Sequence, residues 1–204
     1  MNGRFVAFEG GEAAGKSTQS ARLADRLDAV RTREPGGTPL GGAIRRLFLD
    51  PATGDLDART EALLMAADRA QHVREVVRPA LEAGRHVVTD RYLYSSIAYQ
   101  AHGRGLDPDV VGLLNRWATD GLLPDVVVLL DVPVDVARAR VAHVAPDRLE
   151  SEDVAFHQRV RAGFHAQAEA DPDRWVVVDG TAVPDAIAAA VWSAVTARLP
   201  DLAT

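Results

Sequence analysis

The stretch RFVAFEGGEAAGKST, residues 4–18, decides the fold of this chain. It begins with a short apolar run, residues 4–9, that predicts a buried strand. Residues 10–17 then match the pattern G-x-x-x-x-G-K-[ST] of a phosphate-binding loop, and a helical pattern follows to about Val30. This order of strand, glycine-rich loop and helix surrounds an anion with backbone N–H groups at a helix N-terminus.

Each residue type of this loop has a physical task. Gly10 and Gly15 permit backbone geometry that other residues resist. Lys16 is expected to bridge the β- and γ-phosphates of a nucleotide, and Ser17 to hold Mg²⁺ through its hydroxyl group. Thr18 either caps the helix or faces solvent. The expected ATP-binding residues are Gly10, Gly11, Glu12, Ala13, Ala14, Gly15, Lys16, Ser17 and Thr18.

Glu12 is unusual in such a loop. A carboxylate inside a loop built for polyanions costs electrostatic energy. The cost is tolerable if the side chain points away, either toward a sugar hydroxyl of a second substrate or toward solvent. The loop sequence alone favours neither.

Valine-rich runs alternate with helical patterns along the rest of the chain. Strands are predicted at 4–9, 29–33, 86–90, 126–131 and 175–179. Helices are predicted at 39–49, 59–83, 93–101, 107–119, 133–142, 152–170 and 183–198. Continuous apolar strands separated by helices are typical of a parallel sheet covered on both faces. We therefore expect an α/β fold, a three-layer sandwich around a roughly five-stranded parallel sheet.

The length of 204 residues suits a single domain, residues 1–204. One segment, HVAPDRLES at 143–151, breaks the helical pattern between two long helices. It forms either a plain connector or a short, mobile lid.

Composition excludes several classes of protein. The net charge is −6 and there is no long Lys/Arg run, which argues against a general nucleic-acid binder. The chain has no cysteine, so it has no disulfide and no thiolate metal site. No apolar stretch approaches the roughly 20 residues needed to span a bilayer, and residues 1–11 lack a signal-peptide core. We expect no membrane partner and a cytoplasmic location.

The other motifs narrow the reaction class. The GTPase base-reading pattern N-K-x-D is missing, and the chain is compact for a motor ATPase. A small-molecule kinase remains, with its acceptor site across the carboxyl-terminal edge of the sheet. The alternatives are a nucleotide-dependent switch or a homologue that has lost catalysis.

Two carboxylates end predicted strands at that edge. Asp90 ends HVVTD and Asp131 ends VVVLLD. Either one could support Mg²⁺ directly or through water, or simply cap backbone N–H groups. Asp90 is favoured because Arg91 follows it, and an arginine can grip a phosphate through two hydrogen bonds.

Residues 33–38 are predicted to form a loop from their composition. The peptide bond before Pro35 is either cis or part of an ordinary trans turn.

The ordered set FEGGEAAGKST, TREPGGT, ADRAQHV, DRYLYSSIAYQ, PDVVVLLDV and DRLE resembles the bacterial thymidylate kinase family, which are P-loop nucleoside-monophosphate kinases. The resemblance covers almost the whole chain, and TREPGGT and DRYxxSxxAYQ are its specific parts. It implies transfer of the γ-phosphate of Mg·ATP to dTMP, giving dTDP and ADP for dTTP synthesis. It also implies a homodimer. The runner-up is a small P-loop kinase with another nucleotide or a deoxynucleoside as its acceptor.

The resemblance implies roles for individual residues. Glu12 would contact the 3′-hydroxyl of dTMP and Arg69 the thymine base. Arg91 would contact the acceptor phosphate, with Asp90 near Mg²⁺. Ser96 and Tyr99, three residues apart, can face one pocket at the thymine edge and the sugar. The implied dTMP-binding residues are Glu12, Glu34, Pro35, Met65, Arg69, Arg91, Ser96, Tyr99 and Gln100.

One departure from the family pattern concerns the thymine base. Met65 stands where the family usually has a phenylalanine stacked on thymine. Its polarizable thioether either covers a base face or belongs to the core. The preference for dTMP over dUMP is therefore open.

The second departure concerns the transition state, which needs a cation beyond Lys16 and Mg²⁺. Some relatives carry an arginine in the loop, where this chain has Ala13 and Ala14, so the cation is expected from the lid. Arg148 is the first candidate, and its alternative is an ion pair with Asp147 or Glu150. Arg140 is the second candidate and Arg159 a weaker one. The expected catalytic residues are Lys16, Asp90, Arg91 and Arg148, and the expected metal ligands are Ser17 and Asp90.

The dimer contact is left open by the sequence. Helical patterns 107–119 and 183–198 lack obvious polar faces. They suit a contact between two copies of the chain and the hydrophobic core equally well.

Overall fold

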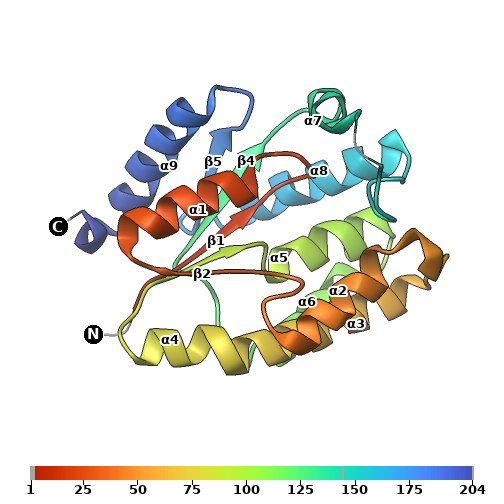
Figure 1. Ribbon diagram of the computed structural model, residues 1–204, viewed down its shortest axis with the longest axis horizontal. Coiled ribbons are helices and arrows are strands. Elements are labelled where there is room, and N and C mark those ends of the chain that lie inside the picture. Colours follow the sequence, from red (N-terminus) through yellow and green to blue (C-terminus); the bar gives the residue numbers. More distant parts are fainter. Residues whose placement is uncertain (1–2, 144, 204) are drawn as a thin grey trace.

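The valine-rich runs form a five-stranded parallel sheet in the order β2-β3-β1-β4-β5 (Figure 1). The computed structural model describes residues 3–143 and 145–203. The strands are β1 (Phe5–Glu9), β2 (Val30–Arg33), β3 (Val87–Asp90), β4 (Val126–Asp131) and β5 (Trp175–Asp179). Each begins and ends within one residue of its prediction. The expected α/β class and five-stranded sheet are confirmed.

Helices cover both faces of this sheet (Figure 1). They are α1 (Lys16–Leu27), α2 (Pro39–Leu49), α3 (Ala58–His72), α4 (Arg78–Glu82), α5 (Leu93–Ser96), α6 (Pro108–Ala118), α7 (Val134–Val141), α8 (Val154–Ala170) and α9 (Pro184–Arg198). Short 3₁₀ turns lie at Pro51–Thr53 and Pro200–Leu202. Over the described part of the chain, no helix is long and apolar enough to cross a membrane.

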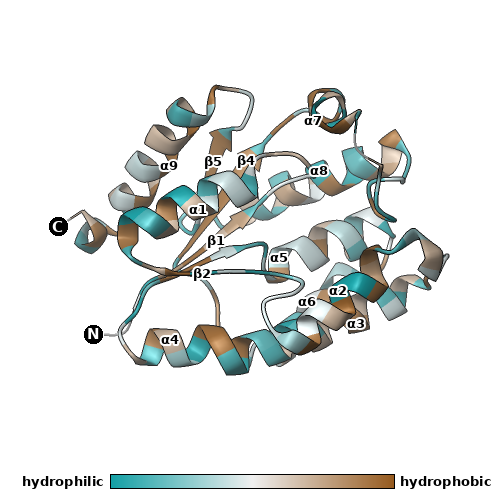
Figure 2. Cartoon of the chain, viewed as in Figure 1, coloured by the Kyte–Doolittle hydropathy of each residue, from teal (hydrophilic) through white to brown (hydrophobic). Residues whose placement is uncertain are grey.

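The central strand β1 shows why both faces need cover. Its side chains alternate between the faces, since successive residues of a strand point in opposite directions. Val6 and Phe8 pack with α1 and α9, whereas Phe5 and Ala7 pack against the side that carries α4. Figure 2 shows β5 in brown and much of the helical surface in teal, whereas β2 at the edge of the sheet is mostly teal and white. The hydrophobic run of β1 is therefore buried from end to end.

Two predicted helices contain π-helical turns. The predicted helix 59–83 consists of α3, a π turn at Val73–Val77, and α4. Pro79 lies just after this turn and has no N–H group for the carbonyl four residues earlier, so a regular ladder cannot run through it. The predicted helix 93–101 continues beyond α5 as a second π turn, Ile97–Gly103.

The segment proposed as a connector or lid is packed over its second half. Val144 lies outside the described residues. Asp147 Oδ1 accepts hydrogen bonds from the N–H groups of Leu149 and Glu150, both at 2.9 Å. The Arg148 N–H donates to the Leu49 carbonyl at the end of α2 (3.0 Å). The turn at 147–151 is thereby fixed against α2.

Candidate active site

The loop at residues 10–17, here called the phosphate loop, joins β1 to α1 as predicted. Gly10 has φ of 137°, and a Cβ there would lie 2.5 Å from the Leu130 carbonyl oxygen, so only glycine fits. Gly15 adopts a left-handed φ of 91° at the N-terminus of α1. The backbone geometry expected of both glycines is confirmed. The loop and the positive end of α1 together suit an anion.

Lys16 is the only lysine of the chain. It is buried, and its Nζ donates to the Gly11 carbonyl oxygen at 2.6 Å. Burial and the nearby Arg91 lower the pKa of Lys16 to about 8, while Glu12 and Asp90 oppose that shift. A bound polyphosphate would raise this pKa again, because opposite charge favours the ammonium form.

The structure distinguishes the two strand-end carboxylates. The Ser17 hydroxyl donates to Asp90 Oδ2 at 2.5 Å, which places two hard oxygen ligands beside the phosphate loop. Asp131 is instead bound by Arg161, through two bonds of 2.7 Å, and by His165 at 3.0 Å. Ser17 and Asp90 therefore fit the oxygen chemistry of Mg²⁺.

A divalent cation at that pair would also depend on the nucleotide. Among the described residues, no group of three or more His, Cys, Asp or Glu could hold a metal ion. Mg²⁺ commonly binds through one or two protein oxygens together with substrate phosphates and water. The small number of protein ligands at Ser17 and Asp90 suits that mode.

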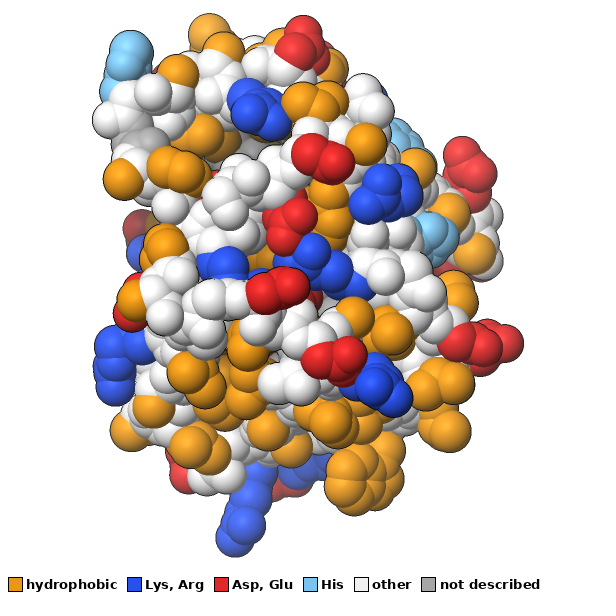
Figure 3. Space-filling model, turned by 90° about the vertical axis from the view of Figure 1, so that its right-hand side faces the viewer, with side chains coloured by type: hydrophobic (Ala, Val, Ile, Leu, Met, Phe, Trp, Pro, Cys, Tyr) orange, Lys and Arg blue, Asp and Glu red, His pale blue; other side chains and the backbone are white. Residues whose placement is uncertain are grey.

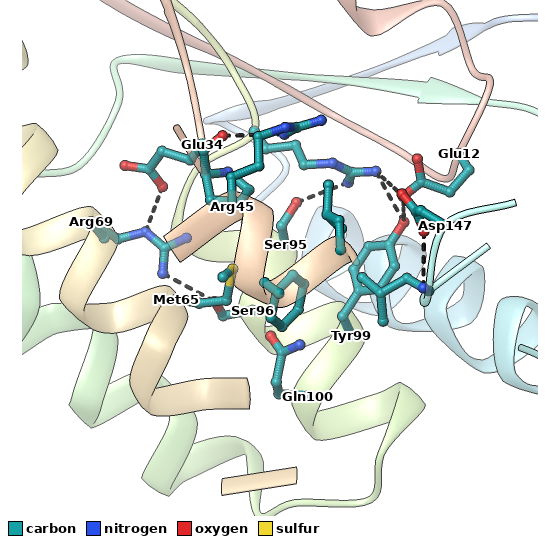
Figure 4. A pocket seen from close by; sticks show the side chains of 15 residues that line it. Glu12, Glu34, Arg45, Met65, Arg69, Ser95, Ser96, Tyr99, Gln100 and Asp147 are labelled. Atoms are coloured by element: carbon teal, nitrogen blue, oxygen red, sulfur yellow. Dashed lines mark hydrogen bonds and ion pairs between the residues drawn. The ribbon is translucent and has the colours of Figure 1, made fainter. Parts of the chain in front are cut away.

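A cavity lies beside the phosphate loop (Figure 4). All nine residues of the implied dTMP set line it: Glu12, Glu34, Pro35, Met65, Arg69, Arg91, Ser96, Tyr99 and Gln100. Six further lining residues were not expected from the sequence: Arg45, Phe48, Leu49, Ser95, Asp147 and Leu149. Acidic and basic side chains gather in the middle of the face that Figure 3 shows, with hydrophobic side chains around them.

Arg91 links the phosphate loop to the cavity. Its Nη1 donates to the Gly10 carbonyl oxygen (3.0 Å) and to Ser95 Oγ (3.1 Å). Its Nη2 donates to Glu12 Oε1 (2.6 Å) and to the Tyr99 hydroxyl (3.0 Å). One guanidinium therefore contacts groups of both sites.

Glu12 points toward the cavity, which answers the question that the loop sequence left open. Its Oε1 accepts hydrogen bonds from Arg91 and from the Tyr99 hydroxyl (2.7 Å) (Figure 4). Burial works against the charged form, but Arg91 and Lys16 lower the pKa of Glu12 to about 2. The carboxylate is thus ionised, and its charge is balanced by the cations beside it.

Arg69 is a buried group rather than a solvated helix charge. Its Nε donates to Glu34 Oε2 (2.7 Å) and its Nη1 to Ser96 Oγ (3.0 Å). Nη1 also donates to Asn115 Oδ1, and Nη2 donates to the Tyr92 carbonyl oxygen (3.1 Å). These contacts come from three segments of the chain, namely the loop after β2, the segment of α5 and helix α6, and they fix the guanidinium at the cavity wall.

The loop that follows β2 supplies part of the same wall. The Glu34–Pro35 peptide bond is cis, which the sequence had left open. Glu34 also contacts His72 Nδ1 at 2.7 Å. Burial opposes ionisation of Glu34, but Arg69 and His72 lower its pKa. The ion pair with Arg69 thus ties this loop to α3.

Arg148 has neither of the ion-pair partners considered from the sequence. Its Nη1 donates to Glu61 at 2.6 Å, and its Nε donates to the Phe48 carbonyl oxygen at 2.9 Å. The ion pair with Asp147 or Glu150 was wrong, because the turn at 147–151 directs this side chain toward α2 and α3. Within the described residues, its guanidinium makes no hydrogen bond to the phosphate loop.

The other two lid-side arginines differ in where they point. Arg140 on α7 donates to the Ala13 carbonyl oxygen (3.0 Å) and to the Gly180 carbonyl oxygen (2.8 Å). It therefore contacts the phosphate loop. Arg159 donates to the Gly103 carbonyl oxygen through two bonds of 3.0 and 3.2 Å.

Two charged residues near the cavity were not predicted from the sequence, Arg45 and Glu61. Arg45 lines the cavity, and burial together with Arg33 and Arg91 lowers its pKa. Glu61 is fully buried and binds both Arg148 and Arg104. In the sequence each of them is only a charge within a helical pattern, which usually indicates a solvated face. Their position near the cavity follows only from the tertiary structure.

Comparisons with known proteins agree with this site. The family model described as "Thymidylate kinase" matches residues 8–191. The thymidylate kinase of Thermomicrobium roseum is 53% identical over 199 residues, which cover 94% of each chain. That of Bifidobacterium longum (strain NCC 2705) is 49% identical over 211 residues, with 100% of both chains covered.

A solved structure is similar as well. The crystal structure of thymidylate kinase from Ehrlichia chaffeensis matches with a TM-score of 0.80 at 30% sequence identity. The match covers 96% of this chain and 100% of that one. The resemblance drawn from the motifs, with its P-loop kinase fold, is confirmed, and the chain belongs to the thymidylate kinase family.

Proposed function

We propose that this enzyme, a dTMP kinase, transfers the γ-phosphate of ATP to dTMP and releases dTDP and ADP. The observation that carries the proposal is the position of Arg91, which hydrogen-bonds to Gly10 of the phosphate loop and to Glu12 and Tyr99 of the cavity. A donor phosphate and an acceptor phosphate would meet beside this guanidinium. The product serves nucleotide biosynthesis, toward dTTP.

On the donor side, the phosphate loop and Lys16 would hold the ATP phosphates, with Thr18 at the exposed start of α1. Ser17 and Asp90 would hold Mg²⁺, because their oxygens lie 2.5 Å apart beside the loop. When bound, the cation neutralises charge on the transferring phosphate group.

On the acceptor side, the cavity offers matched groups for each part of dTMP. Glu12 and Tyr99 would face the sugar, and Arg91 the phosphate. Arg69, Ser96 and Gln100 would face the polar edge of the base, with Met65 against its ring. Arg45 is a further cation for the acceptor phosphate, because it lines the cavity near Arg91. Glu34 and Pro35 would shape the wall through the contact with Arg69.

The chemistry needs positioning more than proton transfer. The attacking oxygen of the acceptor phosphate is already anionic, so a general base adds little, and no covalent enzyme intermediate is required. Catalysis then consists of alignment and charge neutralisation. Within the single domain 1–204, a lid at about 143–151 would exclude water during transfer, with its turn at 147–151 held against α2.

Release of ADP with different acceptors tests the substrate. We expect dTMP to give the highest kcat/KM, with dUMP about tenfold lower because one methyl contact is lost. Activity with dCMP and AMP should be lower still, because their bases present different hydrogen-bonding groups to Arg69 and Gln100. The proposal is wrong if dTMP gives no rate above an ATP-only blank while another acceptor does.

The arginine that serves the transition state is tested by a pair of substitutions. We propose Arg140 for this role, because it already contacts the phosphate loop. Arg140→Ala should lower kcat about a hundredfold with little change in melting temperature. Arg148→Ala should instead destabilise the fold by about 3 kcal/mol, because it leaves Glu61 with a buried, partly unpaired charge. A large loss of kcat in Arg148→Ala at unchanged melting temperature would reverse this assignment.

We also propose that the chain forms a homodimer through the outer face of α3 and α6. Four large apolar side chains are exposed there: Leu63 by 58%, Val110 and Leu113 by 64% each, and Trp117 by 80%. Helix α9 is less suitable, because Ile187, Val191 and Val195 face the core. Large exposed apolar side chains that gather on one face often mark a protein contact.

Sedimentation of a Trp117→Asp variant checks the dimer. We expect its mass to fall from twice the chain mass of 21.9 kDa to the chain mass, because a buried, unpaired carboxylate opposes association. Val183→Asp, at an apolar residue exposed by 68% before α9, is the matched control and should stay dimeric. A wild-type monomer at micromolar concentration would contradict the proposal.

The remaining expectations belong to the same proposal. The substrates are small molecules, without a nucleic-acid or membrane partner. The location is cytoplasmic, since a chain without cysteine has no need of an oxidising compartment.

A further inference from the structure

Glu9 is a fully buried carboxylate that none of the roles above uses. It ends β1, directly before the phosphate loop. Its Oε1 accepts hydrogen bonds from the N–H groups of Tyr92 (2.9 Å) and Ser95 (3.2 Å). Its Oε2 accepts from the Ser95 hydroxyl at 2.5 Å. A single side chain thus binds both ends of the turn that follows Arg91.

Ser95 connects this carboxylate to the guanidinium. A hydroxyl group has one hydrogen and two lone pairs. Because its hydrogen goes to Glu9, a lone pair of Ser95 Oγ is free to accept from Arg91 Nη1, at 3.1 Å. Figure 4 shows Ser95 and Glu12 on opposite sides of the guanidinium to which both are hydrogen-bonded. The hydrogen-bond chain therefore runs from Glu9 through Ser95 to Arg91, and on to Glu12.

The backbone of Arg91 needs the same support. Its φ of 71° lies in the left-handed region, which is strained for a residue with a side chain. The Arg91 N–H donates to the Phe8 carbonyl oxygen (2.9 Å), and the next N–H, of Tyr92, donates to Glu9. Both hydrogen bonds tie the turn to the last residues of β1, so β1 holds Arg91 in its unusual conformation.

We propose that Glu9 is a positioning residue for the acceptor phosphate, which it serves by fixing the Arg91 side chain through Ser95 and the Arg91 backbone through the Tyr92 N–H. The proposal rests on the phosphate-binding role given to Arg91 above. It assigns to β1 a second task besides carrying the phosphate loop. It also gives a task to a carboxylate that ends an otherwise apolar, buried strand.

The charges around Glu9 agree with an ionised carboxylate that is easily protonated. Burial raises the pKa of Glu9 to about 7, while Ser95, Arg91 and Arg69 favour the charged form. Lys16 and Tyr94 also interact electrostatically with Glu9. A protonated Glu9 would donate to Ser95 and turn the serine hydrogen toward Arg91. Ser95 Oγ would then no longer accept the hydrogen bond from Arg91 Nη1.

Glu9→Gln tests the proposal with almost no change of shape. The amide oxygen can still accept from both N–H groups, but the amide nitrogen donates to Ser95 and reverses the polarity of the link. We expect the KM for dTMP to rise about tenfold, because one charge-assisted hydrogen bond is lost. The KM for ATP should change less than twofold. Glu82→Gln, at an exposed carboxylate on α4, is the matched control and should behave as wild type.

A double-substitution cycle separates positioning from general structural support. Glu9→Gln should have almost no further effect on the KM for dTMP when Arg91 is already alanine, because the residue to be positioned is gone. An equal rise in both backgrounds, or no rise in either, would overturn the proposal. If Arg91→Ala alone leaves the KM for dTMP unchanged, the phosphate role of Arg91 fails instead.

The pH profile gives an independent readout. The wild-type KM for dTMP should rise on acidification from pH 8 to pH 6 more than that of Glu9→Gln, since titration of dTMP itself is common to both. Identical profiles would count against Glu9. Should Glu9→Gln fail to fold, Ser95→Ala removes only the linking hydroxyl and must reproduce the rise in KM.

Discussion

Replacement of Lys16 by alanine should lower kcat about a thousandfold, the largest single effect expected in this enzyme. The Lys16 Nζ donates to a neutral carbonyl oxygen, that of Gly11, and a bound polyphosphate would supply the negative charge that favours its ammonium form. No other lysine can replace it, because the chain has none. Steady-state kinetics with dTMP and ATP measure the loss.

Chemical labelling checks the same lysine without substitution. A pKa of about 8 leaves much of Lys16 neutral and nucleophilic at pH 8, so an amine reagent should modify it, apart from the N-terminus. Bound ATP should protect it. Arg85→Ala, which removes a cation at the opposite edge of the sheet, is the control and should keep full activity. A Lys16→Ala variant within tenfold of wild-type kcat would exclude a kinase role for this loop.

Arg91→Ala should be the second most damaging change, with a fall in kcat/KM for dTMP of about three hundredfold, or about 3.4 kcal/mol. The substitution removes two donors from the acceptor phosphate. It also leaves Glu12 without the cation 2.6 Å away that favours its ionised form. Both effects weaken the acceptor site, whereas ATP affinity should change little.

Arg91→Lys distinguishes charge from geometry. Lysine keeps the charge but presents no planar fork, and it cannot bond to Gly10, Ser95, Glu12 and Tyr99 together. We expect it to recover no more than about a tenth of the lost activity. Isothermal titration with dTMP reports the affinity directly. Unchanged dTMP affinity in both variants would place the acceptor phosphate elsewhere in the cavity.

The sequence by itself determined the order of elements and the place of the phosphate loop. Both are local properties. A run of valines predicts a buried strand wherever it lies, and Gly10, Gly15, Lys16 and Ser17 lie within one short segment. The family motifs are also short segments, and the nine residues that they imply for the acceptor all line one cavity.

Only the tertiary structure decided which charges meet. Asp90 and Asp131 look alike as strand ends, yet one lies beside Ser17 and the other is neutralised by Arg161. For Arg148 the sequence offered a role at the transition state or an ion pair within its own turn, but its partner is Glu61, 87 residues away in the chain.

The physical reason is that ionic partners in a core are chosen by packing rather than by sequence distance. A buried charge must find a partner wherever the fold brings one within reach. Glu9 shows this most clearly: its position in β1 predicts only burial, and its contacts with Ser95 and the Tyr92 N–H depend on how β3 and α5 pack against that strand.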